Sequence, residues 1–163
     1  MPDIFSKCIH CSDKSAGQCS KKLSSVILGE LVMILGSCAC GSVQYKVDGE
    51  LKDFSHCHCS ICRKLHGAAF ATWGGVGRAN LSIDKGGELL KAYSFSKNTD
   101  SIFCSQCGSP IFADYKPNQK KIYLTLGTVD TKLDCPPGFH EFVGSKAPWF
   151  EITDDLPQFR ESS

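Results

Sequence analysis

The sequence has few of the features that mark several large classes of protein. Its 163 residues include no apolar run near the ~20 residues that a membrane-spanning helix needs. Lys and Arg total 18 and Asp and Glu total 17, so there is no excess of positive charge for binding nucleic acid. Internal repeats and low-complexity tracts are absent as well. We therefore expect a globular protein with neither a membrane nor a nucleic-acid partner.

Cysteine, in contrast, is abundant, with 11 residues. An odd number would leave one cysteine over in a complete disulfide framework. Seven of them form three tight clusters, namely Cys38-x-Cys40, Cys57-x-Cys59-x-x-Cys62 and Cys104-x-x-Cys107. Cysteines this close rarely pair with each other, but they readily direct two thiolates at one metal ion. The spacing favours zinc and a reducing, cytoplasmic compartment.

Seven thiols divide most simply into one closed site of four and one open site of three, which predicts two zinc ions per chain. The structural site would join the two distant pairs, Cys38, Cys40, Cys104 and Cys107. The open site would be the local triple, Cys57, Cys59 and Cys62, with one position left for water or substrate. Cys135, a histidine or a permanent water could instead fill that position. Three thiolates make zinc a poor Lewis acid, which favours thiol chemistry over peptide hydrolysis.

From Gly36 onward the chain reads as mainly β. Alternating apolar residues or short apolar runs predict strands over 43–47, 69–73, 89–95, 102–107, 109–115, 122–126 and 140–143. Turn residues punctuate them, such as Gly74-Gly75 after the second of these segments. The segment 60–66 predicts a helix that is capped at its C-terminus by Gly67. The segments 116–121 and 131–138 are expected to be loops.

The N-terminal residues 1–34 form a predicted extension to a domain over residues 35–160. Cys8, Cys11 and Cys19 lie in this extension, either as free thiols or as part of a further metal knuckle. The apolar stretch 23–35 before Cys38 has the outline of a weak signal peptide with a lipoprotein-type cleavage site. Lipidation would, however, remove a thiol that the metal site needs. The competing interpretation is a helix or strand that packs on the domain.

Three motifs together resemble the glutathione-dependent formaldehyde-activating enzyme family. They are GSCACGSVQY at 36–45, HCHCSICRKLHG at 56–67 and FCSQCGS at 103–109. The family shares its domain with centromere protein V. Further matching segments follow, so that the resemblance covers about residues 35–160. One departure is Asp100-Ser101, where family members often carry a basic residue.

The resemblance implies a β-tent fold of small stacked antiparallel sheets with little helix and two zinc sites. It implies the same division of the cysteines into a structural and a catalytic zinc site. The implied activity is that of a carbon–sulfur lyase, which joins glutathione and formaldehyde into S-(hydroxymethyl)glutathione. Two other functions stay open: a non-catalytic glutathione-binding module and a protein-interaction module, each stabilised by zinc.

Several side chains near the triple have two possible roles. Arg63, Lys64 and His66 follow the last cysteine and could bind glutathione carboxylates, or form a solvated helix face. His56 and His58 could carry protons or support the metal ligands, or point elsewhere because they alternate with the cysteines. Aromatic residues could wall a pocket or pack in the core, namely Phe70, Trp73 and Trp149.

Overall fold

The computed structural model describes residues 33–133 and 138–162, which belong to one compact unit of the chain. Predictions for the extension, including Cys8, Cys11 and Cys19, lie outside the described residues, as does Cys135. No helix in the described part of the chain is long and apolar enough to cross a membrane.

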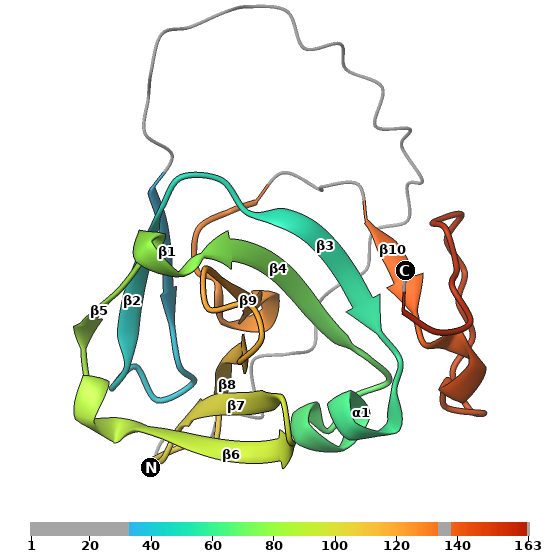
Figure 1. The fold of residues 1–163 in the computed structure, drawn as a ribbon, viewed down its shortest axis with the longest axis horizontal. Helices are drawn as coiled ribbons and strands as arrows, with labels where there is room; N and C mark the ends of the chain where they lie inside the picture. The colour runs from blue at the N-terminus through green and yellow to red at the C-terminus, as the bar shows by residue number, and fades with distance from the viewer. Residues whose placement is uncertain (1–32, 134–137, 163) are drawn as a thin grey trace, which may run out of the picture. The chain divides into compact units, whose positions relative to one another are not determined.

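Two β-sheets make up most of the structure (Figure 1). The smaller sheet has the strand order β1-β2-β5, with β1 (Met33–Ser37), β2 (Gln44–Asp48) and β5 (Leu81–Lys85). The larger sheet has the order β10-β3-β4-β9-β8-β7-β6. Its strands are β3 (Lys52–Cys57), β4 (Ala71–Gly77), β6 (Leu90–Ser96), β7 (Thr99–Cys104), β8 (Pro110–Tyr115), β9 (Lys121–Thr125) and β10 (Phe139–Glu141). All strand pairs described are antiparallel except β10 with β3.

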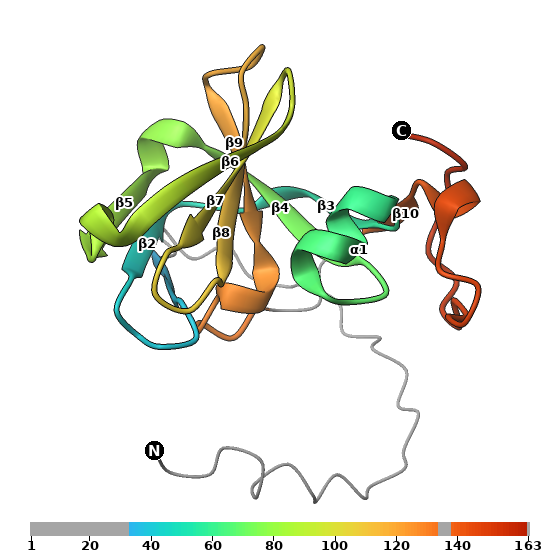
Figure 2. The same ribbon diagram turned by 90° about the horizontal axis from the view of Figure 1, so that it is seen from below.

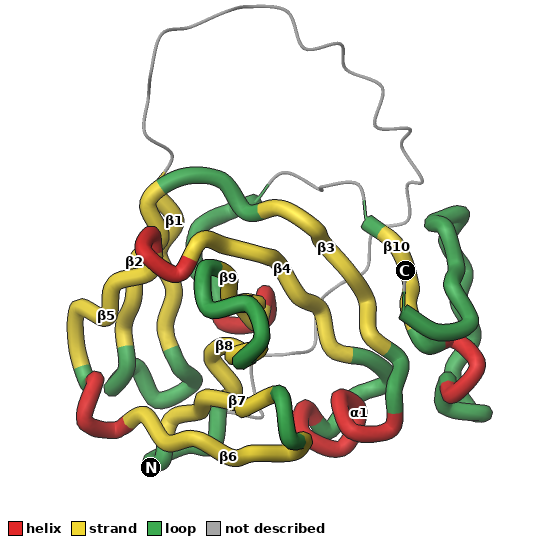
Figure 3. The backbone as a smooth tube through the Cα atoms, viewed as in Figure 1, coloured by secondary structure: helices red, strands yellow, loops and turns green. Residues whose placement is uncertain are grey.

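Helix is scarce, as the sequence predicts (Figure 3). The one described α-helix, α1 (Ser60–His66), matches the predicted segment. The side chain of Cys59 caps its N-terminus, and Gly67 ends it in the left-handed conformation with φ 58°. Four single 3₁₀ turns complete the described elements, namely η2 (Arg78–Asn80), η3 (Gly87–Leu89), η4 (Leu126–Thr128) and η5 (Val143–Ser145). The prediction of a mainly β fold of stacked antiparallel sheets is confirmed.

The buried side chains form two clusters. The larger one lies between the two sheets and includes the inward residues of β2, Tyr45 and Val47, together with Ile111, Ile122 and Leu124. This inward alternation on β2 is the pattern that predicted the strand. The smaller cluster contains two cysteines of the predicted open site, Cys57 and Cys62, together with Ala71, Trp73 and Ala113. Figure 2 shows α1 beside β4, at the end of the larger sheet where this cluster lies.

Several strand limits differ from the prediction for local reasons. β4 runs through Gly74 and Gly75, which had indicated a turn, because these glycines sit where neighbouring side chains approach the strand closely. β7 ends at Cys104, where the N–H of Gly108 closes a turn on its carbonyl. β10 stops before Phe142, whose φ of 57° is incompatible with a strand.

Gly36 gives a test of the packing between β1 and its neighbours. A Cβ atom at this position would overlap the ring of Tyr45 and lie 2.6 Å from the carbonyl oxygen of Thr128. The Tyr45 hydroxyl is also fixed by a 2.8 Å hydrogen bond to the Thr128 hydroxyl. We expect Gly36→Ala to lower the free energy of unfolding by about 2 kcal/mol, through overpacking. Urea denaturation measures the effect. The control is Gly127→Ala, whose added Cβ meets nothing within 4 Å, and equal losses in both variants would contradict the packing argument.

Candidate active site

Two groups of cysteine sulfur atoms converge, with the membership that the spacing predicts. In the four-cysteine group, the Sγ atoms of Cys38, Cys40, Cys104 and Cys107 all lie within 4.8 Å of one another. The first pair follows β1, and the second pair spans the turn after β7. The backbone N–H of Val43 donates to Cys38 Sγ at 3.2 Å, a contact that favours a thiolate. Four convergent sulfurs form a closed tetrahedral donor set that could hold a metal ion such as zinc.

The second group is the cysteine triad, Cys57, Cys59 and Cys62, whose Sγ atoms also lie within 4.8 Å of one another. Cys57 is the last residue of β3, Cys59 caps α1 and Cys62 lies in the first turn of that helix. The N–H of Cys62 donates to Cys59 Sγ at 3.3 Å. No histidine or carboxylate of the described residues joins the three sulfurs as a fourth donor. The triad could therefore hold a metal ion with one position left open.

Hydrogen bonds within the triad separate the acidities of its thiols. Those from Cys57 and Cys62 lower the pKa of Cys59, which favours a thiolate at this sulfur. The hydrogen bond to Cys59 raises the pKa of Cys57. A metal ion that binds all three sulfurs must therefore displace protons, which makes its affinity fall as the pH falls.

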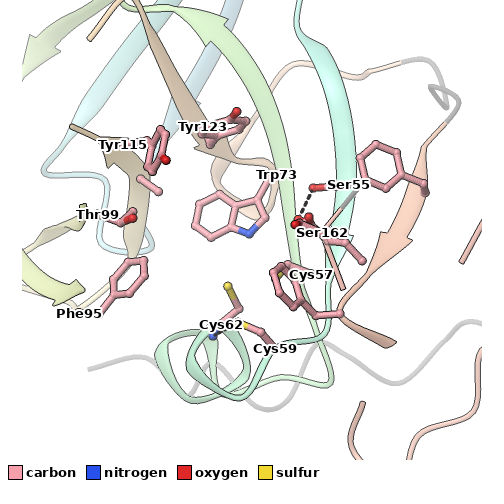
Figure 4. Close-up of a pocket in the computed structure, with 14 residues that line it drawn as sticks. Ser55, Cys57, Cys59, Cys62, Trp73, Phe95, Thr99, Tyr115, Tyr123 and Ser162 are labelled. Carbon is pink, nitrogen blue, oxygen red and sulfur yellow. Dashed lines mark hydrogen bonds between the residues drawn. The ribbon is translucent and has the colours of Figure 1, made fainter. Parts of the chain in front are cut away.

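The triad opens into a cavity of about 470 Å³ (Figure 4). Six aromatic side chains line it, namely Trp73, Phe95, Tyr115, Tyr123, Phe139 and Phe142. Trp73 lies above Cys62 in Figure 4, while Phe95 and Tyr115 form the wall across the cavity from Cys57. An apolar cavity with a few convergent polar groups is the usual form of a small-molecule site.

Glu141 supplies the charged group of this cavity. It is the last residue of β10 and pairs in parallel register with Cys57 of β3. Its Oε1 atom accepts a 3.0 Å hydrogen bond from the Ser55 hydroxyl, and burial raises the pKa of the carboxyl group. No other acidic or basic side chain lines the cavity in the described part of the chain. Sequence reasoning missed Glu141; the available signal was a lone acidic residue between His140 and Phe142 in a predicted strand.

The basic residues of α1 do not line the cavity. The Arg63 guanidinium donates to two carbonyl oxygens, that of His58 at 3.3 Å and that of Ser145 at 3.2 Å. Lys64 is absent from the lining as well. His66 packs edge-on against Trp73, with 5.1 Å between the ring centroids. Of the three aromatic residues singled out in the sequence, only Trp73 lines the cavity, since Phe70 packs on His58 and Trp149 is 71% exposed.

His56 and His58 belong to a layer of imidazoles that is separate from the cavity lining. His58 is fully buried, and its Nε2 atom lies 2.8 Å from Nδ1 of His140. Nε2 of His140 lies 3.1 Å from a carboxylate oxygen of Asp154. Because a carboxylate only accepts, His140 donates to Asp154, and its other nitrogen then accepts from His58. His56 stacks on His140 and contacts the Thr72 hydroxyl at 3.0 Å.

This hydrogen-bonded chain holds the segment that carries the triad. The backbone N–H of His58, between Cys57 and Cys59, also donates to the carbonyl oxygen of Glu141 at 3.0 Å. Asp154, His140 and His58 thus hold the segment 57–59 in place through hydrogen bonds in which the cysteine sulfurs take no part. In this arrangement His58 and His140 support the predicted metal ligands rather than facing the cavity.

We expect the full chain to purify with two zinc ions and Cys57→Ser to retain one, with little change in thermal unfolding. Cys104→Ser, in contrast, should lower the unfolding temperature, because its group joins segments that are distant in sequence. Metal analysis together with thermal denaturation measures both effects. Cys135→Ser is the control: a loss of zinc there would identify Cys135 as a fourth ligand. One zinc per wild-type chain would contradict the four-plus-three division.

His140→Ala should weaken metal retention by the triad about 10- to 100-fold, because the segment 57–59 loses the hydrogen bond between His58 and His140. Competition with a chelator measures this, and the four-cysteine group should be unaffected. His56→Gln is the matched control, since it alters a neighbouring imidazole but keeps the His58–His140 hydrogen bond. Equal metal retention in wild type and His140→Ala would exclude the supporting role.

Several known proteins are similar to this chain. A Halomonas elongata protein, named provisionally as a glutathione-dependent formaldehyde-activating enzyme, is 27% identical over 74% of this chain and 82% of its own length. An Aspergillus terreus protein with the same provisional name is 32% identical over 68% of this chain and 61% of its own. An uncharacterised lyase of Schizosaccharomyces pombe is 25% identical over 55% of this chain and 63% of its own. The chain thus spans about three fifths of these two fungal relatives.

A crystal structure of a Rhodobacter sphaeroides protein superposes with a TM-score of 0.51 and 26% identity, over 61% of this chain and 90% of that one. The sequence profile of the glutathione-dependent formaldehyde-activating enzyme family matches residues 33–145, a span that contains both cysteine groups and Glu141. On this evidence the chain belongs to the glutathione-dependent formaldehyde-activating enzyme family.

Proposed function

We propose that the chain is a zinc-dependent carbon–sulfur lyase. It would join glutathione, or another thiol, with formaldehyde or a related small electrophile, and with the first pair the product is S-(hydroxymethyl)glutathione. The observation that carries the proposal is a triad of three sulfurs, without a fourth described donor, at one side of a ligand-sized cavity. The family and the names of the relatives support the choice of substrates.

In this proposal the four-cysteine group holds a structural zinc ion and the triad holds a catalytic one. Zinc bound by three thiolates supplies an open position that holds a thiol sulfur and lowers the pKa of that thiol. The free thiols and the absence of disulfides among the described cysteines suit a reducing compartment such as the cytoplasm.

The reaction needs little beyond positioning. A carbon–sulfur bond forms, the carbonyl double bond becomes a C–OH single bond, and the thiol proton passes to oxygen. Ser55 fixes one oxygen of the Glu141 carboxyl group, and the other can take up the thiol proton and pass it to the aldehyde oxygen. Trp73 and Phe142 pack beside the cysteines of the triad and make this side of the cavity apolar.

The test is the rate of adduct formation from glutathione and formaldehyde by the zinc-loaded full chain, measured by exchange NMR. The uncatalysed reaction is subtracted, because thiols add to aldehydes unaided. We expect a rate clearly above this background, and no such excess for Cys57→Ser. Glutathione binding without any excess rate would instead identify a non-catalytic glutathione-binding module.

Because Cys57→Ser removes a proposed metal ligand, a second variant keeps all the cysteines. Glu141→Gln should lower kcat/KM about 100-fold, since its amide cannot take up a proton. The exposed Glu151 provides the control, Glu151→Gln, which should match wild type. Unchanged kinetics in Glu141→Gln would remove Glu141 from the mechanism and leave the triad as its only component.

A further inference from the structure

The size of the cavity exceeds what formaldehyde needs. At about 470 Å³ it lies within the range of pockets that bind drug-sized ligands. Formaldehyde contributes one carbon and one oxygen to an adduct, and both must lie next to the sulfur. If only the thiol end of glutathione enters the cavity, the space that extends from the triad to the wall of Phe95 and Tyr115 is available to a larger group on the aldehyde.

The lining of that space is apolar and aromatic. Phe95 comes from β6, Tyr115 ends β8 and Tyr123 lies in β9, so three strands contribute aromatic rings to the wall. Trp73 and Phe142 pack beside the triad, and Phe95 and Tyr115 lie across the cavity from it (Figure 4). Rings arranged in this way favour a flat apolar ligand, by burial and by ring–ring contacts.

The charge of the lining disfavours an anionic ligand part. Glu141 is negative when ionised, and no lysine or arginine of the described residues lines the cavity. The neighbouring cations are engaged elsewhere: Arg63 binds backbone carbonyls, and the Lys146 ammonium donates to the carbonyl oxygen of Phe150. The lining thus offers no partner for a carboxylate, so the two carboxylates of glutathione have to lie outside the cavity with only the thiol end reaching the triad. A neutral apolar group on the aldehyde needs no such partner.

The backbone conformation of Phe142 also shapes this cavity. Phe142 has a φ of 57°, a conformation that is costly for a residue with a Cβ. Its N–H is held by the carbonyl oxygen of Glu161, and its own carbonyl accepts from the N–H of Ser145. These contacts maintain a conformation in which the Phe142 ring packs against the smaller buried cluster around the triad and lines the cavity.

Building on the proposed lyase function, we propose that the preferred electrophile is an aldehyde with an apolar, aromatic-sized substituent. The adduct has the form R–CH(OH)–S–R′, where R is that substituent. Its sulfur faces the triad, its hydroxyl faces Glu141, and R occupies the space bounded by Trp73, Phe95 and Tyr115. The bond changes are those of the formaldehyde reaction, with no oxidation or reduction.

The first experiment compares three aldehydes at constant glutathione: formaldehyde, phenylacetaldehyde and glyoxylate, which is small and anionic. Each rate is divided by its uncatalysed rate, so that differences in intrinsic reactivity cancel. We expect the enhancement for phenylacetaldehyde to exceed that for formaldehyde at least tenfold, and glyoxylate to give the lowest. An equal or greater enhancement for formaldehyde would overturn the proposal.

A pair of variants tests whether the wall sets this preference. Tyr115→Ala should reduce the ratio of the phenylacetaldehyde to the formaldehyde enhancement about tenfold. Tyr93→Ala is the matched control, because Tyr93 is 54% exposed and lies two residues from Phe95 on β6, outside the cavity lining. A ratio unchanged in Tyr115→Ala, or changed equally in both variants, would contradict the assignment of the wall.

A binding measurement separates this proposal from the lyase function. The chain has two tryptophans, and in a Trp149→Phe background Trp73 alone reports on the cavity by fluorescence. We expect unreactive 2-phenylethanol to give a saturable change that is weakened by Tyr115→Ala. Binding without turnover of any aldehyde would refute the lyase function and leave the apolar site standing. Formaldehyde turnover without 2-phenylethanol binding would refute the apolar site alone.

Discussion

The parallel pairing of β10 with β3 is the constraint on which the rest of the site depends. It is the one parallel pair in the described sheets, and it sets Glu141 opposite Cys57 and His140 opposite His56. Because side chains alternate along a strand, neighbouring residues of β10 point to opposite faces of the sheet. Glu141 reaches the cavity, while His140 joins the buried imidazoles. A shift of one residue in this register would exchange the two roles.

The imidazole layer and the triad are therefore coupled, because the segment 57–59 contributes side chains to both. Full burial of a histidine such as His58 lowers the stability of the fold unless its polar atoms form hydrogen bonds. His140 and Asp154 pair one ring nitrogen through a continuous chain, and the backbone N–H of His58 is taken by Glu141. The C-terminal segment extends this support, because the N–H of Phe159 donates to the carbonyl oxygen of His140. The short segment that carries the triad is thus held by residues from the last quarter of the chain.

The sequence predicted the features that depend on nearby residues. The triad lies within six positions, α1 has its own caps, and β2 shows plain alternation, so each could be inferred locally. The cavity could not be inferred, since its aromatic rings come from separate strands that meet only through the order of the larger sheet. β3 was missed because its residues are mostly polar or charged and show no clear apolar alternation. The glycines of β4 likewise indicated a turn, because close approach and chain reversal both favour glycine.

The two cysteine groups close loops of very different length. The four-cysteine group joins residues near 38 to residues near 107, so a metal ion bound there is coupled to folding itself. The triad closes a loop of six residues, which are already held by α1, β3 and the imidazole layer, so a metal ion there adds little to stability. If zinc occupies both groups, the triad has one ligand fewer and would lose its zinc first, so a cell mildly short of zinc would accumulate folded but inactive protein. Activity would then follow the zinc supply, while the abundance of the protein stayed constant.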